Sequence, residues 1–265
     1  MTFDLPTLIS LGHLEMVCYR DGFLIAPEAS DTTDLGYDFV KPFYGDDIDG
    51  MKPYGFIAVS QDTGEPVAVF RGTEGAAEWI ANANADLVQC PFFPPGCRTH
   101  HGFTRVYQTL RLLDGTPLKA ALSELGPDLV FLGHSLGASE ATLAAADLGA
   151  VALVTFASPR VGNDRFCSQA IDRIGTVLRL VNLDDLVPRV PISLFGNLFK
   201  YDHVGAPDSL DPNGQVADNL ICQHHVTTYL HLLDPAQPLD AGCAGGELVS
   251  PHYMVVRGSV IGRPN

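Results

Sequence analysis

The chain has 265 residues, of which 46% are hydrophobic and 18% charged, so it is too apolar for a disordered segment and suits one large domain. Lys and Arg number 16 against 31 Asp and Glu, which gives a formal net charge of −15. Such a field repels polyphosphates and anionic membrane faces, so we exclude nucleic acid as a ligand.

Targeting signals are not evident in this sequence. The first residues carry no basic region ahead of an apolar run, and no apolar stretch approaches the roughly 20 residues that a membrane-spanning helix needs. We therefore expect a soluble protein without a transmembrane segment. By default it is cytoplasmic, and secretion is the alternative.

The first third of the chain predicts one helix and then an irregular stretch. Apolar residues at steps of three and four predict an amphipathic helix over residues 5–20. Residues 37–53 are rich in Asp, Gly and Pro and show no periodicity. The acidic run 46–50 resembles a calcium loop, but Gly45 and Phe56 stand where such a loop needs acidic ligands, so we interpret it as a solvated turn.

The remaining elements alternate between strands and helices. Short β-branched runs predict strands, and the first two, joined by a turn over residues 61–65, read as an antiparallel hairpin. Helical stretches separate the later strands, which predicts crossover connections and a largely parallel sheet. We find no repeat, low-complexity tract or linker, so residues 1–265 are interpreted as a single domain. The predicted strands are 54–60, 66–70, 128–132, 151–156 and 176–181, and the predicted helices are 102–113, 117–125 and 136–148.

Six cysteines could form three bridges, but an even count is weak evidence in a chain of this size. Only Cys90 and Cys97 look arranged for pairing. They bracket a Pro-rich turn whose restricted backbone holds its ends together. We expect this pair to be bridged in an oxidising compartment.

A serine between two glycines carries the chemical signal. The predicted strand 128–132 runs into Gly133-His134-Ser135-Leu136-Gly137, and a helix follows. A serine at such a turn stands above the carboxyl edge of the sheet, and both glycines are needed because a Cβ would clash with the strand and helix. The helix that begins there also points N–H groups at the same spot, which favours the oxyanion of an acyl transfer. We therefore predict Ser135 as a nucleophile.

A serine nucleophile needs a histidine base and an acid that orients it. Asp185 follows the predicted strand 176–181 and precedes an apolar run that can shield it, so we prefer it to Asp184. Among the later histidines we favour the pair His224 and His225, because it lies on a loop before the predicted helix 226–233 and is free to reach the edge of the sheet. Within the pair we prefer His225. No metal is expected there, since adjacent side chains diverge and no acidic or Cys ligand stands at ligand spacing. The other candidates are His203, in a predicted strand 199–204, His231 and His252.

Several motifs in order resemble the class 3 lipases, the fungal-type triacylglycerol lipases and related feruloyl esterases. The resemblance implies the α/β-hydrolase fold, an α/β architecture with a mostly parallel central sheet flanked by helices and a short helical lid. Ala138 stands where the family often has a second Gly, and the loop from Cys90 to Cys97 resembles a disulfide-closed loop of secreted members. The matching stretches are residues 69–73, 97–103, 133–137, 159–163 and 182–188.

The resemblance also implies roles for individual residues. The acid is the Asp directly before Leu-Val-Pro, which is Asp185, and the base is a His shortly before an aromatic residue, as His225 stands to Tyr229. The oxyanion donors are Thr73, after Phe-Arg-Gly, and the N–H of Leu136. Paired donors matter, because losing one typically costs about 2.7–4 kcal/mol of transition-state stabilisation.

A lid and an acyl pocket complete the expected site. Residues 74–89 are the candidate lid, a helix whose apolar face contains Trp79, Ile80, Ala83 and Leu87. We expect it to cover the site in water and to make transient contact with a lipid–water interface. The expected substrate-binding residues are Trp79, Leu186, Val187, Ile192 and Leu194.

These features predict a serine carboxylic ester hydrolase that needs no cofactor and no metal. Its expected substrates are acylglycerols or other small-molecule or lipid esters. Two alternatives remain open: a soluble short-chain or feruloyl-type esterase, and a non-catalytic binding protein on the same scaffold.

Overall fold

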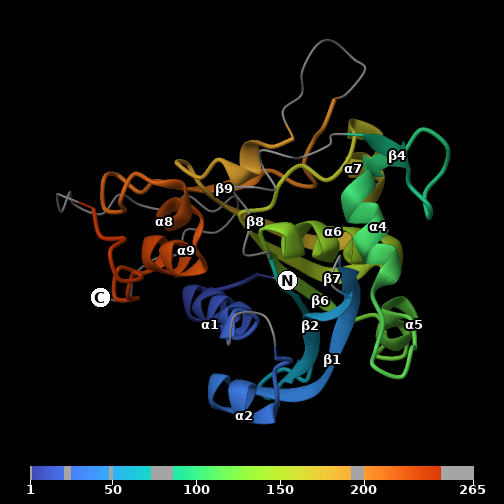
Figure 1. Ribbon diagram of the computed structural model, residues 1–265, viewed down its shortest axis with the longest axis horizontal. Coiled ribbons are helices and arrows are strands. Elements are labelled where there is room, and N and C mark those ends of the chain that lie inside the picture. Colours follow the sequence, from blue (N-terminus) through green and yellow to red (C-terminus); the bar gives the residue numbers. More distant parts are fainter. Residues whose placement is uncertain (1, 21–24, 48–49, 73–85, 192–199, 246–265) are drawn as a thin grey trace.

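The computed structural model describes residues 2–20, 25–47, 50–72, 86–191 and 200–245. Within them a seven-stranded sheet has the order β1-β2-β3-β6-β7-β8-β9, and β4 and β5 form a separate two-stranded sheet (Figure 1). The strands are β1 (Tyr37–Asp47), β2 (Gly50–Ser60), β3 (Pro66–Phe70), β4 (Leu87–Gln89), β5 (Arg98–His100), β6 (Val130–His134), β7 (Ala150–Phe156), β8 (Ile174–Asn182) and β9 (Pro207–Leu210).

The mostly parallel sheet predicted from the sequence is confirmed. Strands β3, β6, β7, β8 and β9 pair in parallel, whereas β1, β2 and β3 pair antiparallel. The predicted hairpin is β2–β3, with Gly55 opposite Phe70 and Val59 opposite Pro66. Parallel neighbours bring their carboxyl ends to one edge, so β6 and β8 deliver Ser135 and Asp185 to the same side of the molecule.

The irregular stretch expected over residues 37–53 is wrong for most of its length. Residues Tyr37–Asp47 form β1, an edge strand along β2. Its register shifts between Phe39 and Lys41 and again between Phe43 and Tyr44. Each shift breaks the alternation of inward and outward side chains, which is why the sequence shows no period of two.

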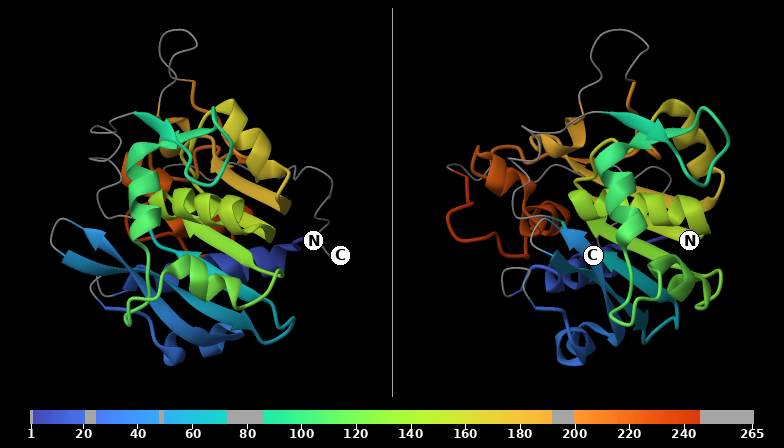
Figure 2. Two further views of the ribbon diagram at one scale, coloured as in Figure 1. Left: turned by 90° about the vertical axis from the view of Figure 1, so that its right-hand side faces the viewer. Right: turned by 45° about the vertical axis from the view of Figure 1, so that its right-hand side comes forward.

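Helices cover both faces of the sheet, which the further views in Figure 2 also show. One face packs against α4, α5, α6 and α7, and the other against α1 and α9. Short helices α2 and α8 lie outside these layers in Figure 1. The helices are α1 (Leu5–Val17), α2 (Ala29–Thr32), α4 (His101–Thr109), α5 (Leu118–Ser123), α6 (Leu136–Leu148), α7 (Asp164–Ile171), α8 (Leu220–His224) and α9 (Val226–Leu233), with 3₁₀ turns η2 (Thr33–Leu35) and η3 (Val187–Arg189).

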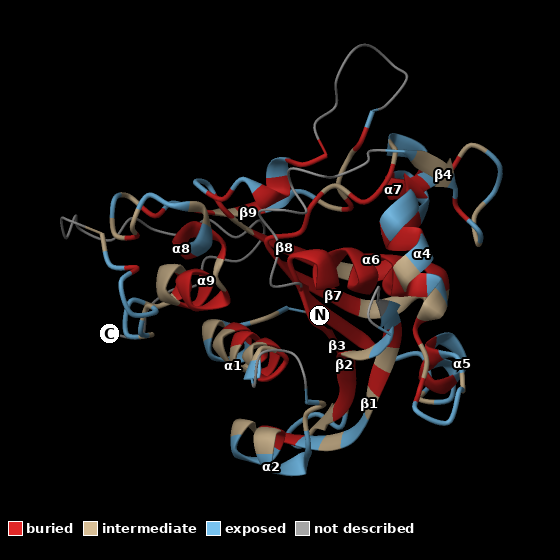
Figure 3. Ribbon diagram, in the orientation of Figure 1, coloured by how far each residue is buried: buried red, intermediate tan, exposed pale blue. Residues whose placement is uncertain are grey.

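The central strands are buried on both faces, as Figure 3 shows. All five residues of β3 are buried: Val67 and Val69 belong to the core under α1, while Ala68 and Phe70 belong to the core under α6. A strand covered on both sides needs apolar residues at every position. This is why the middle strands read as continuous apolar runs in the sequence.

Two expected segments differ from the structure or lie outside it. Most of the candidate lid, including Trp79, lies outside the described residues, and Leu87, which was placed on its helical face, belongs to strand β4. Strand β4 pairs antiparallel with β5. The strand expected over 199–204 is absent from the described residues of that range: Asp202 makes only an isolated bridge to Gly162, and β9 begins at Pro207.

The predicted cysteine bridge is also wrong. Cys90 and Cys97 are close at the backbone, with Cys90 N–H donating to Cys97 O at 2.8 Å, but both are free and buried in the core. Burial raises the pKa of the Cys90 thiol to about 11, so it stays a protonated, unreactive thiol. The bridge instead joins Cys222 and Cys243, separated by 21 positions.

In the part of the chain that the structure describes, every helix is too short or too polar to cross a bilayer.

Candidate active site

Ser135 occupies the turn between β6 and α6, with φ 58° and ψ −127°. Positive φ is unfavourable for any residue with a Cβ and costs of order 1–3 kcal/mol when the surrounding structure enforces it. The turn is held by Ser135 N–H, which donates to Phe156 O at 3.0 Å. This conformation lifts the hydroxyl above the carboxyl edge of the sheet, as the sequence predicts.

The glycines on either side of Ser135 permit this turn. A Cβ on Gly137 would lie 1.9 Å from Phe70 O, and one on Gly133 would lie 2.5 Å from Gly137 O. Strand β3 and helix α6 therefore approach at backbone contact distance. The predicted clash with the neighbouring strand and helix is confirmed at both positions.

A histidine lies between Ser135 and a carboxylate. His224 Nε2 is 2.8 Å from Ser135 Oγ, and His224 Nδ1 is 2.8 Å from Asp185 Oδ2. His224 is 7% exposed and Asp185 1% exposed, so bulk water does not weaken the contact between them. This is the arrangement of nucleophile, base and orienting acid that acyl transfer requires.

The histidine that makes these contacts is not the one preferred from the sequence. His225 turns away from Ser135: its Nδ1 is 2.9 Å from Thr227 Oγ1, and its Nε2 is 3.1 Å from Asp240 Oδ2. His224 is the last residue of α8 and His225 caps α9, so the two side chains leave the backbone in different directions. The resemblance cue, a His shortly before Tyr229, fits both positions and could not separate them.

Asp185 is held by donors to both of its oxygens. Val187 N–H donates to Oδ1 at 2.9 Å, and the Tyr229 hydroxyl donates to Oδ2 at 2.7 Å, beside the His224 contact. These donors satisfy a charge that would otherwise be unpaired in the interior. Asp184, the alternative acid, is exposed.

Tyr229 is fully buried, and burial together with the adjacent Asp185 raises the pKa of its hydroxyl well above the usual value. It therefore remains a proton donor to Asp185 at any physiological pH. The sequence offered Tyr229 only as a marker for the base and gave no sign of this contact.

A second hydrogen-bonded chain lies behind the triad. Gly72 N–H donates to the Tyr19 hydroxyl at 3.0 Å, that hydroxyl lies 2.5 Å from His134 Nδ1, and His134 Nε2 lies 2.7 Å from His224 O. Burial lowers the pKa of His134 well below its usual value, so the ring is neutral. A neutral ring that donates from Nε2 accepts the Tyr19 proton at Nδ1, so every donor has an acceptor.

This series of hydrogen bonds links Gly72, just after β3, to the backbone of His224. Sequence reasoning missed Tyr19, which lies on the segment after α1 and carries no motif. It also treated His134 as an unspecified residue of the serine turn.

One of the two expected oxyanion donors, Leu136, directly follows Ser135 in the chain. Leu136 is the first residue of α6, where a backbone N–H has no partner within the helix. Gly72 lies against the nucleophile, since a Cβ on it would be 2.9 Å from Ser135 Cβ. Thr73 follows Gly72 in the chain but lies outside the described residues.

The expected substrate-binding residues are only partly described. Trp79, Ile192 and Leu194 lie outside the described residues. Leu186 is 47% exposed next to Asp185, where a substrate could reach it. Val187 is buried at 1% exposure, so its side chain belongs to the core and its backbone serves Asp185. The pocket role expected for Val187 stays a prediction, because residues 192–199 of the expected pocket lie outside the described residues.

Comparison with protein families matches residues 67–195 to the lipase (class 3) family. The matched range contains Ser135 and Asp185. It ends before His224.

Among curated proteins, a secreted mono- and diacylglycerol lipase 1 of Fusarium solani is 35% identical over 150 residues, covering 53% of this chain and 44% of that protein. A chloroplastic phospholipase A(1) of Arabidopsis thaliana is 32% identical over 191 residues, covering 60% and 42%. The chain thus spans about half the length of these relatives. A crystal structure of a fungal lipase superposes with a TM-score of 0.60 at 24% identity, covering 78% of each chain, which shows a shared fold.

Proposed function

Because the chain belongs to the class 3 lipase family, we propose that it hydrolyses carboxylic esters of lipids, acylglycerols foremost, through a Ser135–His224–Asp185 triad. The observation that carries the proposal is the pair of 2.8 Å contacts on the two nitrogens of His224. The names of the relatives support the substrate class, since they describe lipases and a phospholipase.

The first half of the reaction forms an acyl-enzyme. His224 holds its Nδ1 proton toward Asp185, which leaves Nε2 free to accept the proton of Ser135 Oγ. The oxygen attacks the ester carbonyl carbon, and the resulting oxyanion accepts hydrogen bonds from Leu136 N–H and from the donor expected at Thr73. The tetrahedral intermediate collapses as His224 returns the proton to the leaving alcohol.

The second half repeats these steps with water. His224 removes a proton from a water molecule that attacks the acyl carbon, and Ser135 leaves with that proton. Asp185 stays ionised throughout and stabilises the transient imidazolium. Its donors Val187 and Tyr229 keep the carboxylate aimed at Nδ1.

The Cys222–Cys243 disulfide gives evidence on the cellular compartment in which the protein folds. A bridge such as Cys222–Cys243 is typical of proteins that fold in an oxidising environment, and one relative is named as secreted. Both observations favour secretion over the cytoplasmic default expected from the sequence.

A series of chromogenic esters of increasing acyl length tests the proposal. We expect turnover that rises with chain length, and we expect Ser135→Ala to abolish it while the far-UV circular dichroism stays unchanged. A fluorophosphonate should label the wild type and leave Ser135→Ala unlabelled. Retained turnover in Ser135→Ala would refute the nucleophile assignment. A rate that falls beyond short chains would instead select the short-chain or feruloyl-type esterase, and absent labelling the non-catalytic binding protein.

A further inference from the structure

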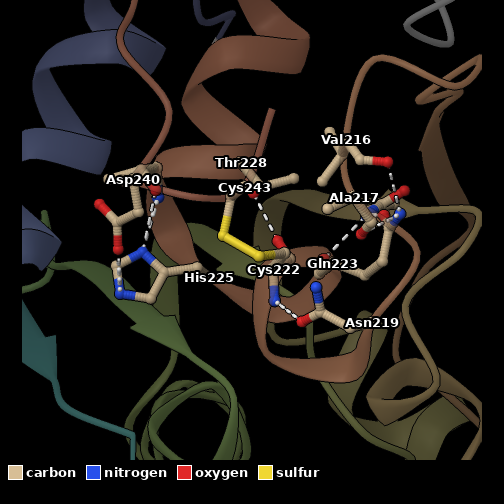
Figure 4. Close-up of a disulfide and its surroundings, with 11 residues drawn as sticks. Val216, Ala217, Asn219, Cys222, Gln223, His225, Thr228, Asp240 and Cys243 are labelled. Atoms are coloured by element: carbon tan, nitrogen blue, oxygen red, sulfur yellow. Dashed lines mark hydrogen bonds and ion pairs between the residues drawn. A yellow bond between two sulfur atoms is a disulfide. The ribbon is translucent and has the colours of Figure 1, made fainter. Parts of the chain in front are cut away.

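Two residues close to His224 in the chain, Cys222 and His225, both contact one short segment near the end of the described residues. Cys222, two positions before His224, is bridged to Cys243, and His225, the next residue, pairs with Asp240 (Figure 4). Cys243 N–H donates to Asp240 O at 3.0 Å, so both partners belong to one turn. We call residues 240–243 the clamp turn.

The clamp turn is itself anchored to the loop that precedes α8. Ala217 N–H donates to Cys243 O at 2.9 Å, and Gly245 N–H donates to Gln215 O at 2.8 Å. The bridge is buried, with both cysteines 5% exposed, and it packs with Val216 in a small apolar cluster separate from the main core. The clamp turn therefore has its own contacts with the rest of the structure, and through the disulfide it can restrain the segment that carries His224.

The segment that carries His224 is also hydrogen-bonded to the central sheet, through Gln223. Asn182 Nδ2 donates to both Gln223 O and Gln223 Oε1 at 2.8 Å, and Asn182 is the last residue of β8, three positions before Asp185. Gln223 thus sets the distance from His224 to the acid. On the side of Ser135, His134 Nε2 donates to His224 O at 2.7 Å and ties the same segment to the serine turn.

The helix that carries His224 is too short to hold its own position. Helix α8 has five residues, and a single isolated turn pays the cost of helix nucleation without much propagation. Its geometry must therefore come from tertiary contacts, of which the Cys222–Cys243 bridge is the covalent one. A displacement of about 1 Å in a catalytic group can cost on the order of 100-fold in rate.

We propose that the Cys222–Cys243 disulfide and the His225–Asp240 pair are positioning elements that hold His224 against Ser135, so that opening the disulfide lowers turnover. The proposal rests on the function proposed above. It gives His225 a role beside the triad. The His225–Asp240 contact, whose side chains are 38% and 46% exposed, is the weaker of the two ties, because it is not covalent and is open to water.

Controlled reduction of the purified wild-type protein tests the proposal. A dithiol reductant supplies two electrons and two protons, the Sγ–Sγ bond breaks to give two thiols, and the reductant becomes its own disulfide. Thiol titration in denaturant should then rise from four to six per chain. We expect kcat on a dissolved ester to fall by roughly 10- to 100-fold, with KM nearly unchanged, because the acyl site is untouched.

Two variants separate positioning from general stability. Cys222→Ala/Cys243→Ala should show the low kcat of the reduced wild type and no response to reductant, whereas Cys167→Ala, which removes a buried free thiol of α7, should respond as the wild type does. Should the double variant fail to fold, reduction of the folded wild type, monitored by circular dichroism, gives the same comparison. Asp240→Asn should lower kcat less than twofold alone and several-fold in the reduced protein, since the pair is then the remaining tie.

The outcomes distinguish the two proposals. If the oxidised wild type neither turns over esters nor reacts with a fluorophosphonate, the hydrolase proposal fails. If the oxidised protein is active and the reduced protein, with six titrated thiols, has the same kcat, the positioning role of the disulfide is refuted. A loss of kcat on adding reductant while the thiol count stays at its starting value would refute it as well, because the Cys222–Cys243 bridge would then still be intact.

Discussion

Removing the hydroxyl of Tyr19 tests the hydrogen-bonded chain behind the triad. Tyr19→Phe keeps the ring but leaves two buried groups without their partner, the N–H of Gly72 and Nδ1 of His134. An orphaned buried polar group costs about 1–3 kcal/mol, so the two together cost about 2–6 kcal/mol of unfolding free energy. That is a large part of the total stability of about 5–15 kcal/mol of an ordinary domain.

The surroundings of Tyr19 place the expected loss in the lower part of this range. The Tyr19 ring lines a surface hollow of about 310 Å³ together with Met16 and His225. Water entering from this hollow can replace part of the lost hydroxyl. We expect a loss of about 2–4 kcal/mol, together with a fall in kcat, because Gly72 directly precedes the expected oxyanion donor Thr73.

Tyr107→Phe is the matched control. Its buried hydroxyl donates to Asp147 Oδ2 at 3.0 Å, so one buried acceptor loses its partner instead of two buried groups. Asp147 Oδ1 keeps Lys119 Nζ at 2.7 Å, so a loss of about 1 kcal/mol is expected. Urea unfolding followed by fluorescence gives the free energies, and a dissolved chromogenic ester gives kcat. The reasoning is refuted if Tyr19→Phe unfolds like the wild type, or if both variants lose kcat equally.

Three further predictions concern the base, a buried acid and the serine turn. His224→Ala should lower kcat at least 1,000-fold and His225→Ala less than 100-fold; the reverse order in steady-state kinetics would restore the assignment made from sequence. Glu140 is fully buried without a hydrogen-bond partner, and burial raises its pKa well above the usual value. Its protonated form therefore stabilises the fold fully at pH values below about 4.5, and this stability is lost as the pH rises toward the raised pKa. Glu140→Gln should accordingly be more stable relative to the wild type at pH 9 than at pH 5 in urea titrations, whereas the exposed Glu124→Gln should show no such difference. Gly137→Ala would place a Cβ 1.9 Å from Phe70 O, so we expect loss of soluble protein on expression, and a folded, active variant would contradict the close approach.

The sequence determined those features that depend on local pattern. Continuous apolar runs and helical periodicity located β3, β6, β7, β8 and α6, because both signals come from the chain itself. The serine turn was equally local, since Gly133 and Gly137 are required by backbone contacts that any strand–turn–helix unit of this kind must make. Asp185 was placed by its position after a strand of the same sheet.

The tertiary structure alone decided which side chains meet. His224 and His225 are neighbours with the same chemistry, and only the end of α8 and the start of α9 determine that the first faces Ser135 and the second faces Asp240. The cysteines behave in the same way. Cys90 and Cys97 are close in sequence and at the backbone yet remain free, while Cys222 finds Cys243 at 21 positions. Local pattern fixes the path of the backbone over a few residues, whereas contacts between distant segments depend on how the whole chain packs, and a single sequence does not encode those directions in any local signal.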